Sequence, residues 1–494
     1  MATGRAARVA GVGGVRRGAV AGGEGEEAAL IALGEEGPGV RGAGVDAGAG
    51  GAEGAGGGAR VGLGPLLAAC SGSVAFGFHV AAVNGCLGAM AGALGLAGAA
   101  QQGLVVSAVL LGAMGGSFVG GPLASVHGRR GALLLAALPL LAGPLLSASA
   151  SSFGAMILGR LVAGAGIGLA STLVPLYVSE ISPTACRGSR GSVVQVCICG
   201  GIVLALLANL ALPGSWRAIF LLSALPGATL AAGMASCPES PQWLLGRGRE
   251  AEAFAAAERL WGAEARAELG PHSGSFDGDD AAAPPERPRA GLLRDGVVLG
   301  GALFLLQQLS GINAIVYFSS DIFRAVGVPS EALASTVVGV VNLGGALLAV
   351  TFMDRFDRRG MLMRSWAAMG AAMAAMAWSA STLPATSPLG QAVAVCGTLV
   401  YILAFALGAG PMPALMVPEL NRAADRDRAM TVAMGTHWAS NVLVGQGFLA
   451  AVACAGVGPV YAGFAAVCFL AVAFVLCCVR ETRGLSLQEL EDAG

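Results

Sequence analysis

The sequence of 494 residues has little charge, no lysine, and no arrangement of residues that is typical of a metal or cofactor site. Only 12% of its residues are charged, about half the share in an average soluble domain, which excludes a chain built of ordinary soluble domains. The net charge of −1 gives no electrostatic reason to bind nucleic acid. The four histidines are scattered without zinc-binding spacing, so we expect neither a metal nor a cofactor.

Other chemical motifs are also missing. The eleven cysteines form no CxxC motif and lie mostly inside apolar runs, where cysteine behaves as a small apolar residue. The glycine-rich stretch from Gly164 to Gly168 has no strand before it, so we interpret it as a surface for close helix packing rather than a phosphate loop. We find no nucleophile–base pair, which argues against a membrane enzyme.

Apolar residues dominate instead, at 55% of the chain, with a mean hydropathy of +0.72. Each of twelve successive apolar runs is long enough to cross a bilayer as a helix. The runs are 63–84, 103–124, 131–150, 153–177, 191–212, 216–236, 294–318, 332–352, 361–382, 390–416, 429–452 and 458–479. We therefore predict an all-α membrane protein with twelve transmembrane helices.

The apolar runs divide the chain into five parts: an N-terminal segment (1–60), a first six-helix bundle (61–236), a polar insert with an amphipathic helix and a linker (237–293), a second six-helix bundle (294–480) and a C-terminal tail (481–494). The N-terminal segment is rich in Gly and Ala, and its first twenty residues carry arginine without acid. The arginines are typical of a transit peptide. The lack of serine and the acids from Glu24 onwards are typical instead of a disordered cytosolic tail, so we keep both interpretations.

Charge placement predicts the orientation of the helices. Arginines gather in alternate connections, whereas 85–102, 383–389 and 453–457 carry no charge. By the positive-inside rule, both termini and the insert then lie on the arginine-rich side.

The two halves also repeat each other. Glu180 and Arg187 recur as Glu419 and Arg426 after 239 residues (419 − 180 and 426 − 187). In the same order, Arg129 and Arg130 recur as Arg358 and Arg359, and Glu239 recurs as Glu481. We predict two pseudo-symmetric bundles, an architecture that supports alternating access. These rim charges would stabilise the state that is closed on the arginine-rich side; the alternative is a solvated rim that serves topology alone.

The densest polar cluster inside an apolar run is Gln307, Gln308 and Asn313, which a bend at Gly311 could bring to one cavity. Amides both donate and accept hydrogen bonds, which suits a neutral polyhydroxyl ligand. Interhelical hydrogen bonding is the alternative. Single polar or aromatic residues of similar character lie in other runs: Gln195, Asn342, Trp438 and Asn441. Gly408, Gly410, Pro411 and Pro413 predict a broken helix in the tenth run.

Together these motifs resemble the sugar porter family of the major facilitator superfamily, and within it the plastidic glucose transporters. The resemblance rests on GRR at 128–130, VPLYVSEISPTACRG at 174–188, PESPQWL at 238–244, QQLSGINA at 307–314, GAGPMPA at 408–414 and the C-terminal ETRGLSLQELE. It implies a hexose site formed by Gln195, Gln307, Gln308, Asn313, Asn342 and Asn441, with Trp438 stacking on the sugar. It also implies an inner gate formed by the rim charges named above.

The resemblance implies facilitated diffusion of a hexose, with D-glucose as the first candidate. The membrane that it implies is the inner envelope membrane of a plastid, and a plasma or vacuolar membrane is the alternative. The partners are then a monosaccharide and the lipid bilayer, with no obligate protein partner. A non-transporting sugar sensor is a second reading of the same cavity. The chain departs from the family at Ala414 and Ala406, where many members have a Trp and some an acid, and at Ser125, where an Asp is usual. Ala414 and Ala406 remove two sugar contacts, and Ser125 predicts a looser inner gate.

Coupling to protons depends on His79 and Arg160. The resemblance places His79 where proton symporters of the family carry an Asp, near the Arg160 position. Burial and a neighbouring permanent cation both disfavour a charged imidazole, which predicts a uniporter. The alternative is a symporter in which His79 itself carries the proton.

Overall fold

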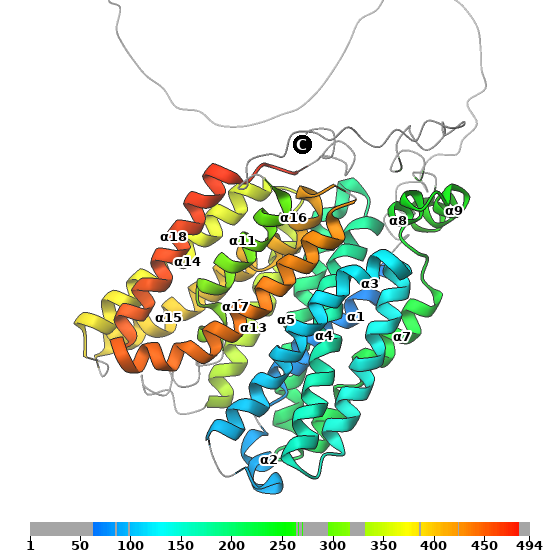
Figure 1. Cartoon of the computed structure of the whole chain (residues 1–494). Helices are drawn as coiled ribbons and strands as arrows, with labels where there is room; N and C mark the ends of the chain where they lie inside the picture. The colour runs from blue at the N-terminus through cyan, green and yellow to red at the C-terminus, as the bar shows by residue number, and fades with distance from the viewer. Residues whose placement is uncertain are drawn as a thin grey trace, which may run out of the picture. The chain divides into compact units, whose positions relative to one another are not determined.

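The computed structural model describes residues 63–83, 86–96, 99–262, 295–316, 331–384, 387–422 and 424–483, together with 265 and 269. The predicted N-terminal segment, residues 270–293 of the insert and residues 484–494 of the tail lie outside the described residues. Within the described ranges the chain forms helices and turns, without strands. Figure 1 shows their arrangement.

Each predicted apolar run falls on a helix. The helices are α1 (Leu63–Ala81), α2 (Leu87–Leu94), α3 (Ala99–Ala148), α4 (Phe153–Ile181), η1 (Thr184–Cys186), α5 (Arg187–Ala211), α6 (Trp216–Leu222), α7 (Leu225–Ser236), α8 (Pro241–Gly246), α9 (Glu250–Trp261), α11 (Gly296–Leu309), α13 (Glu331–Phe352), α14 (Arg358–Thr382), α15 (Pro388–Ala404), η5 (Phe405–Ala409), α16 (Pro411–Leu420), α17 (Arg426–Ala455) and α18 (Val457–Cys478). In the described part of the chain, eight helical stretches are long and apolar enough to cross a membrane.

Some predicted runs share or divide these helices. The 48-residue stretch in α3 covers two runs, and Gly128 interrupts its helical geometry with a φ of 79°. Residues 216–236 form α6 and α7, and residues 388–420 form α15, η5 and α16. Of the predicted insert helix from Arg249 to Leu269, the structure describes α9 and four further residues: Arg249, Gly262, Ala265 and Leu269.

Most of the core lies in two large clusters, one centred on each half of the chain, and a smaller third cluster takes in residues of α1 to α6. One cluster joins α1, α3, α4 and α7 and also takes in residues of α11, α16 and α17, so it extends across the boundary between the halves. The other belongs to α11 and α13–α18. Gly112 and Gly168 bring α3 and α4 into backbone contact, because a Cβ on either would overlap a carbonyl group of the other helix. The glycine-rich stretch of α4 is thus a packing surface, as predicted.

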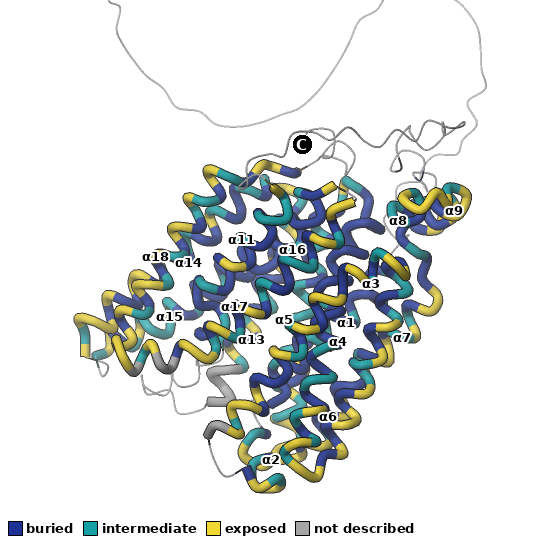
Figure 2. The backbone as a smooth tube through the Cα atoms, in the orientation of Figure 1, coloured by how far each residue is buried: buried dark blue, intermediate teal, exposed yellow. Residues whose placement is uncertain are grey.

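The outer surfaces of the helices are apolar. Large side chains such as Leu138, Leu210 and Leu443 are more than 60% exposed, whereas residues between the helices are buried (Figure 2). In water this exposure would be unfavourable, but in a bilayer the same side chains contact lipid. The pattern fits an integral membrane protein.

Two predicted breaks in the helices are present. The chain bends after α11 at Gly311, whose φ of 93° favours glycine and leaves residues 312–316 in a separate helical turn. Residues Phe405–Ala409 form a π-helical turn before Pro411 begins α16. Pro413 lacks the N–H that would bond to the carbonyl of Ala409, and this carbonyl is free to accept a bond from another helix.

Candidate functional site

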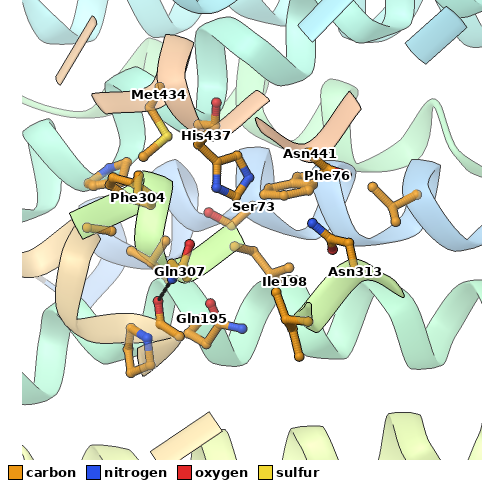
Figure 3. A pocket seen from close by; sticks show the side chains of 18 of the residues that line it. Ser73, Phe76, Gln195, Ile198, Phe304, Gln307, Asn313, Met434, His437 and Asn441 are labelled. Atoms are coloured by element: carbon orange, nitrogen blue, oxygen red, sulfur yellow. Dashed lines mark hydrogen bonds between the residues drawn. The ribbon is translucent and has the colours of Figure 1, made fainter. Parts of the chain in front are cut away.

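A central cavity lies between the two halves. Its empty space amounts to about 1060 Å³ when the open solvent beside it is included, and helices of both halves form its wall. Six of the seven predicted sugar-site residues line it: Gln195, Gln307, Gln308, Asn313, Asn342 and Asn441. Figure 3 shows Gln195, Gln307, Asn313 and Asn441 around the space, among the aromatic side chains Phe76 and Phe304.

The broken helix anchors Gln307. Its Nε2 donates to the carbonyl of Ala409 at 2.6 Å and to that of Gly410 at 3.2 Å. The first of these bonds replaces the one that Pro413 cannot make. The amide of Gln307 is therefore fixed in orientation, and its oxygen points along the cavity wall to Gln308.

Gln308 is the centre of a chain of amides. Its Nε2 donates to Gln307 Oε1 at 3.2 Å and lies 2.8 Å from His437 Nδ1, and its Oε1 accepts a bond from Asn313 Nδ2. Gln307 and Gln308 are at most 3% exposed. Such a chain holds its members in defined orientations while leaving lone pairs and N–H groups at the cavity.

His437 also belongs to this site, although no sequence motif indicated it. An amide nitrogen only donates, so His437 Nδ1 accepts and the ring proton lies on Nε2. The imidazole is half-buried, lines the cavity and packs edge-on against Phe304 at 5.4 Å between ring centroids. Helical spacing could have revealed it, because His437 lies one turn before Asn441 and on the same face of α17.

Trp438 does not line the cavity, contrary to the predicted stacking role. Its side chain is fully buried, and its Nε1 donates to Ser171 Oγ at 3.1 Å. Its ring lies 5.0 Å from that of Phe76. Trp438 therefore joins α17 of the second half to α1 and α4 of the first, and the aromatic wall of the cavity comes from Phe76, Phe304 and Phe405 instead.

Asn342 has an unsatisfied acceptor at the cavity wall. Its side chain is 6% exposed, and its Oδ1 has no hydrogen-bond partner within the described part of the chain. Buried amide oxygens are nearly always satisfied, so a donor supplied by a ligand or by water belongs here.

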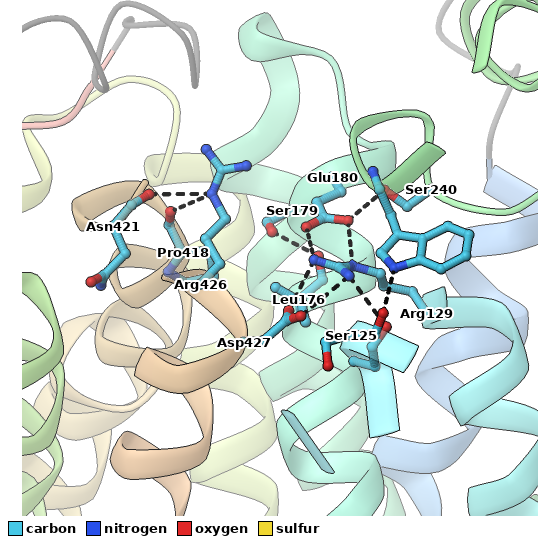
Figure 4. A network of polar contacts seen from close by, with 12 residues as sticks. Ser125, Arg129, Leu176, Ser179, Glu180, Ser240, Pro418, Asn421, Arg426 and Asp427 are labelled. Atoms are coloured by element: carbon cyan, nitrogen blue, oxygen red, sulfur yellow. Dashed lines mark hydrogen bonds and ion pairs between the residues drawn. The ribbon is translucent and has the colours of Figure 1, made fainter. Parts of the chain in front are cut away.

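The rim charges of the first half form a buried network (Figure 4). Arg129 contacts Glu180 through two bonds of 2.8 and 2.9 Å, and Ser240 Oγ donates to the same carboxylate. Glu239 accepts from the backbone N–H groups of Arg129 and Arg130. The Arg130 guanidinium donates to the carbonyls of Met234 and Ala235 at 3.0 and 2.7 Å.

The second half repeats this geometry. Arg358 Nη2 lies 2.9 Å from Glu419 Oε1, and Thr482 donates to Glu419 in the place that Ser240 has at Glu180. Glu481 accepts from the backbone N–H groups of Arg358 and Arg359, as Glu239 does in the first half. The repeat predicted from spacing is thus a repeat of contacts.

The other two predicted rim arginines contact oxygens near their own helix starts. Arg426 Nε donates to the carbonyls of Pro418 and Asn421 at 3.1 and 3.3 Å, and Arg187 Nη2 lies 3.3 Å from Thr184 Oγ1. Both arginines are buried.

Two aspartates that no sequence motif indicated connect the halves at this rim. Asp427, at the start of α17, contacts Arg129 Nη2 at 2.9 Å, and Asp354 accepts from the backbone N–H of Ser189 in α5 at 3.0 Å. By the internal repeat, Asp354 corresponds to Ser125 (354 − 125 = 229), and Asp427 corresponds to Gly188 (427 − 188 = 239). Asp427 thus brings a carboxylate of the facing half to Arg129, whose own half has Ser125 in place of an acid.

His79 and Arg160 are neighbours, as the resemblance implied. Both are at most 1% exposed, and Arg160 Nη1 donates to the backbone carbonyl of His79 at 3.3 Å. Neither ring nitrogen of His79 has a hydrogen-bond partner among the described residues. His79 thus forms its hydrogen bond with Arg160 through its backbone carbonyl and not through its imidazole ring.

Two helical halves around a central polar cavity, closed on one side by charges, define a membrane transporter of the alternating-access type. The family model "Sugar (and other) transporter" matches residues 66–493. The chain is 44% identical over 434 residues to plastidic glucose transporter 4 of Arabidopsis thaliana, covering 86% of the chain and 78% of that relative. It is 30% identical to a galactose-proton symporter of Escherichia coli, covering 86% and 92%.

Among solved structures, the chain is similar to the major facilitator proton:xylose symporter XylE bound to 6-bromo-6-deoxy-D-glucose. The TM-score is 0.77 at 25% identity, covering 88% of this chain and 99% of that one. The TM-score to an inward-open conformation of the E. coli xylose transporter XylE is lower, at 0.64. The chain belongs to the sugar transporter family, which consists of multi-pass membrane transporters and not of enzymes, and the predicted fold class is confirmed.

Proposed function

We propose that this protein carries a hexose, with D-glucose as the first candidate, across a membrane by alternating access. The observation that carries the proposal is the chain of neutral amides on the cavity wall, centred on Gln308. Uncharged donors and acceptors can replace the water that a sugar sheds, and they give no reason to bind an ion. Relatives named as glucose, xylose and galactose transporters support a monosaccharide substrate.

Uptake of radiolabelled D-glucose into proteoliposomes tests this proposal. We expect saturable uptake that other hexoses inhibit. Absence of uptake together with saturable glucose binding would favour the sugar sensor instead.

We propose that the rim network is the inner gate of the transporter. Arg129 bonds to Glu180 in its own half and to Asp427 in the facing half, and Asp354 bonds to the start of α5. These contacts require the halves to be close on the arginine-rich side, so the structure corresponds to the state that is closed there. Opening to that side has to break both connections between the halves.

The inner gate should respond to pH through Asp427. Burial raises the pKa of this carboxyl to about 6; Arg129 and Arg426 lower it only in part, and Glu180 raises it further. An aspartate in water has a pKa of about 3.9. If opening exposes Asp427 to water, the closed state binds the proton more tightly, so acidification from pH 7.5 to pH 5 should favour closure.

Hydrogen–deuterium exchange of the rim peptides, corrected for the intrinsic pH dependence of exchange, measures this effect. We expect stronger protection at pH 5, and an Asp427→Asn variant in which the difference between the two pH values is lost. Weaker protection at pH 5 in the unmodified protein would contradict the assignment.

We propose uniport rather than proton symport. The ring of His79 lacks a hydrogen-bonded partner in the described structure, and the permanently charged Arg160 is adjacent. A proton carrier needs a group to receive its proton, and the described residues around the ring offer none. The relatives include a glucose transporter and a proton symporter, so their names do not decide the matter.

Proteoliposomes with an imposed pH gradient test the uniport proposal. We expect D-glucose to reach the same internal level with and without the gradient, because a uniporter only equilibrates its substrate. Accumulation above the external concentration that disappears in a His79→Gln variant would establish symport through His79.

The inner envelope membrane of a plastid is the location that we propose. Four relatives with plastidic names, between 38% and 44% identical, support it. Imaging the full chain beside a variant that lacks residues 1–60 tests whether this segment directs the protein to plastids. Unchanged plastid location of the shortened chain would assign the segment to a cytosolic tail, and a plasma or vacuolar membrane signal from the full chain would overturn the location itself.

A further inference from the structure

The hydrogen bonds of the amide chain run in one direction, which begins at the broken helix. Gln307 Nε2 faces the backbone carbonyls of Ala409 and Gly410, at 2.6 and 3.2 Å. Carbonyl oxygens only accept hydrogen bonds, so the NH2 group of Gln307 has to lie at this end of the amide. The turn before Pro411 therefore fixes which way the first amide points.

The orientation of Gln307 determines that of the next two amides. Its Oε1 only accepts, and Gln308 presents Nε2 to it at 3.2 Å. The oxygen of Gln308 then lies at the other side of its amide, where Asn313 Nδ2 donates to it. A reversed Gln308 would place its oxygen against that of Gln307, so the network itself excludes the opposite assignment of oxygen and nitrogen.

His437 takes the second N–H group of Gln308. An amide NH2 group has two N–H bonds to donate. Those of Gln308 are directed to Gln307 Oε1 and, at 2.8 Å, to His437 Nδ1. Those of Gln307 are directed to the two backbone carbonyls. What each glutamine still offers to a ligand in the cavity is therefore the remaining acceptor position of its oxygen.

Asn342 adds a third acceptor to the cavity wall. Its Oδ1 has no hydrogen-bond partner among the described residues, and its side chain is only 6% exposed. A sugar hydroxyl can donate to such oxygens. A fluorine atom or an ether oxygen at the same place would instead bring two acceptors together, which leaves a buried polar group without a hydrogen bond.

We infer that His437 sets the hydrogen-bonding direction of the sugar site. Because it accepts from Gln308, the two glutamines only accept from the ligand, and the site selects hexoses with free hydroxyl groups on that side. Analogues that can only accept there are rejected. His437 acts through Gln308 and is thus a positioning residue. The inference rests on the proposed hexose function and narrows its ligands to sugars that are unmodified where they face the glutamines.

Pairs of D-glucose analogues measure this direction. Each pair carries hydrogen or fluorine in place of the same hydroxyl group, at C2, C3, C4 or C6, so that neither member donates and only the fluoro member accepts. Binding is measured by the rise of the unfolding temperature in detergent. Where the hydroxyl donates to the glutamines, we expect both analogues to bind about threefold to tenfold more weakly than D-glucose, and the fluoro analogue no more tightly than the deoxy analogue.

Two substitutions of His437 separate its hydrogen bond from the packing of its ring. The imidazole lies between Phe304 and Phe76, at 5.4 and 6.5 Å between ring centroids (Figure 3). His437→Phe keeps an aromatic ring there but frees one N–H group of Gln308, so the fluoro analogue should now bind about threefold or more tightly than its deoxy partner. His437→Asn supplies an oxygen that can accept in place of Nδ1, and it should keep the order of the unmodified protein.

The ring proton of His437 is a second readout, which requires no sugar. In protein labelled with ¹⁵N-histidine, the nuclear magnetic resonance signals that disappear in His437→Asn belong to this residue. We expect a neutral ring with its proton on Nε2, because Nδ1 accepts from Gln308. A proton on Nδ1 would overturn the inference, even if the His437→Phe variant does not fold.

Three binding results would also overturn the inference. These are fluoro analogues that bind more tightly than their deoxy partners at every carbon where the hydroxyl contributes, an unchanged order in His437→Phe, and an equal change of order in both variants. Because each comparison is a ratio within one protein, a general loss of sugar affinity cancels. Failure of the proposed transport function is distinguishable, since it would appear as absent D-glucose uptake in proteoliposomes, whatever tautomer His437 has.

Discussion

Replacing Gln308 by alanine is expected to reduce D-glucose uptake at least tenfold while leaving the amount of folded protein in the membrane nearly unchanged. The side chain donates to Gln307, contacts His437 and accepts from Asn313, so its loss removes the centre of the amide chain. Each buried partner left without a hydrogen bond costs about 1–3 kcal/mol, and tenfold corresponds to about 1.4 kcal/mol. Uptake kinetics in proteoliposomes, normalised to protein, measure the effect.

Asn209→Ala is the matched control for Gln308→Ala. Asn209 is also an amide in an apolar helix, but it bonds to the carbonyls of Ala82 and Ala205 and does not line the cavity. We expect this variant to lower thermal stability and to leave the apparent affinity for D-glucose within about twofold. Equal effects of the two substitutions on uptake would show that Gln308 is a packing residue.

Replacing Arg129 by glutamine should have the second large effect, by destabilising the state that is closed on the arginine-rich side. Arg129 is the shared partner of Glu180 and Asp427, and all three side chains are largely buried. Removing one partner of a buried ion pair costs about 3–5 kcal/mol, because the remaining charge stays without compensation. We expect loss of transport and faster hydrogen–deuterium exchange in the rim peptides.

Arg130→Gln provides the comparison for Arg129→Gln. The Arg130 guanidinium donates to the backbone carbonyls of Met234 and Ala235 and has no described ion pair, so its loss leaves no buried carboxylate uncompensated. We expect a much smaller change in rim exchange. The gate assignment fails if the two variants open the rim equally.

The helices and the internal repeat could be predicted from the sequence alone. The apolar runs and the alternation of arginine predicted the helices, since a bilayer requires long apolar segments whatever the tertiary contacts. The repeated spacing of Glu180 and Arg187 with Glu419 and Arg426 predicted the two halves. Neither signal requires knowledge of how the halves face each other.

The contacts between the halves could not be predicted in the same way. The pairs of Asp427 with Arg129 and of Asp354 with Ser189 join residues that are 298 and 165 positions apart, and no local pattern records such neighbours. The repeat did contain a signal, because Asp427 stands where the first half has Gly188. Positions at which the two halves carry different residues, and not only those at which they match, would have indicated Asp427.

The rotation of α17 was the other feature that the sequence left open. His437 and Trp438 are adjacent in sequence, and about 100° of rotation separates adjacent side chains on a helix. Because α17 is buried on several sides, its apolar residues do not mark one face. The structure places the imidazole at the cavity and the indole in the boundary between the halves, the reverse of the predicted sugar contact.

Gln307 illustrates how one residue can serve both fold and site. Its position in an apolar run indicated a ligand contact, and it does line the cavity. Its nitrogen, however, satisfies the Ala409 carbonyl that Pro413 leaves without a helical donor. The break in the tenth predicted run and the amide cluster in the seventh are therefore a single structural unit, and a Gln307 substitution should affect stability as well as affinity.

A structure of the protein determined with D-glucose would show whether the amide chain binds the sugar. We expect one hexose in the central cavity, with hydroxyl oxygens at hydrogen-bond distance from Gln308 and Asn313 and a donor at Asn342 Oδ1. A sugar bound outside this cavity, or a cavity that stays empty at saturating D-glucose with the amide chain unchanged, would contradict it.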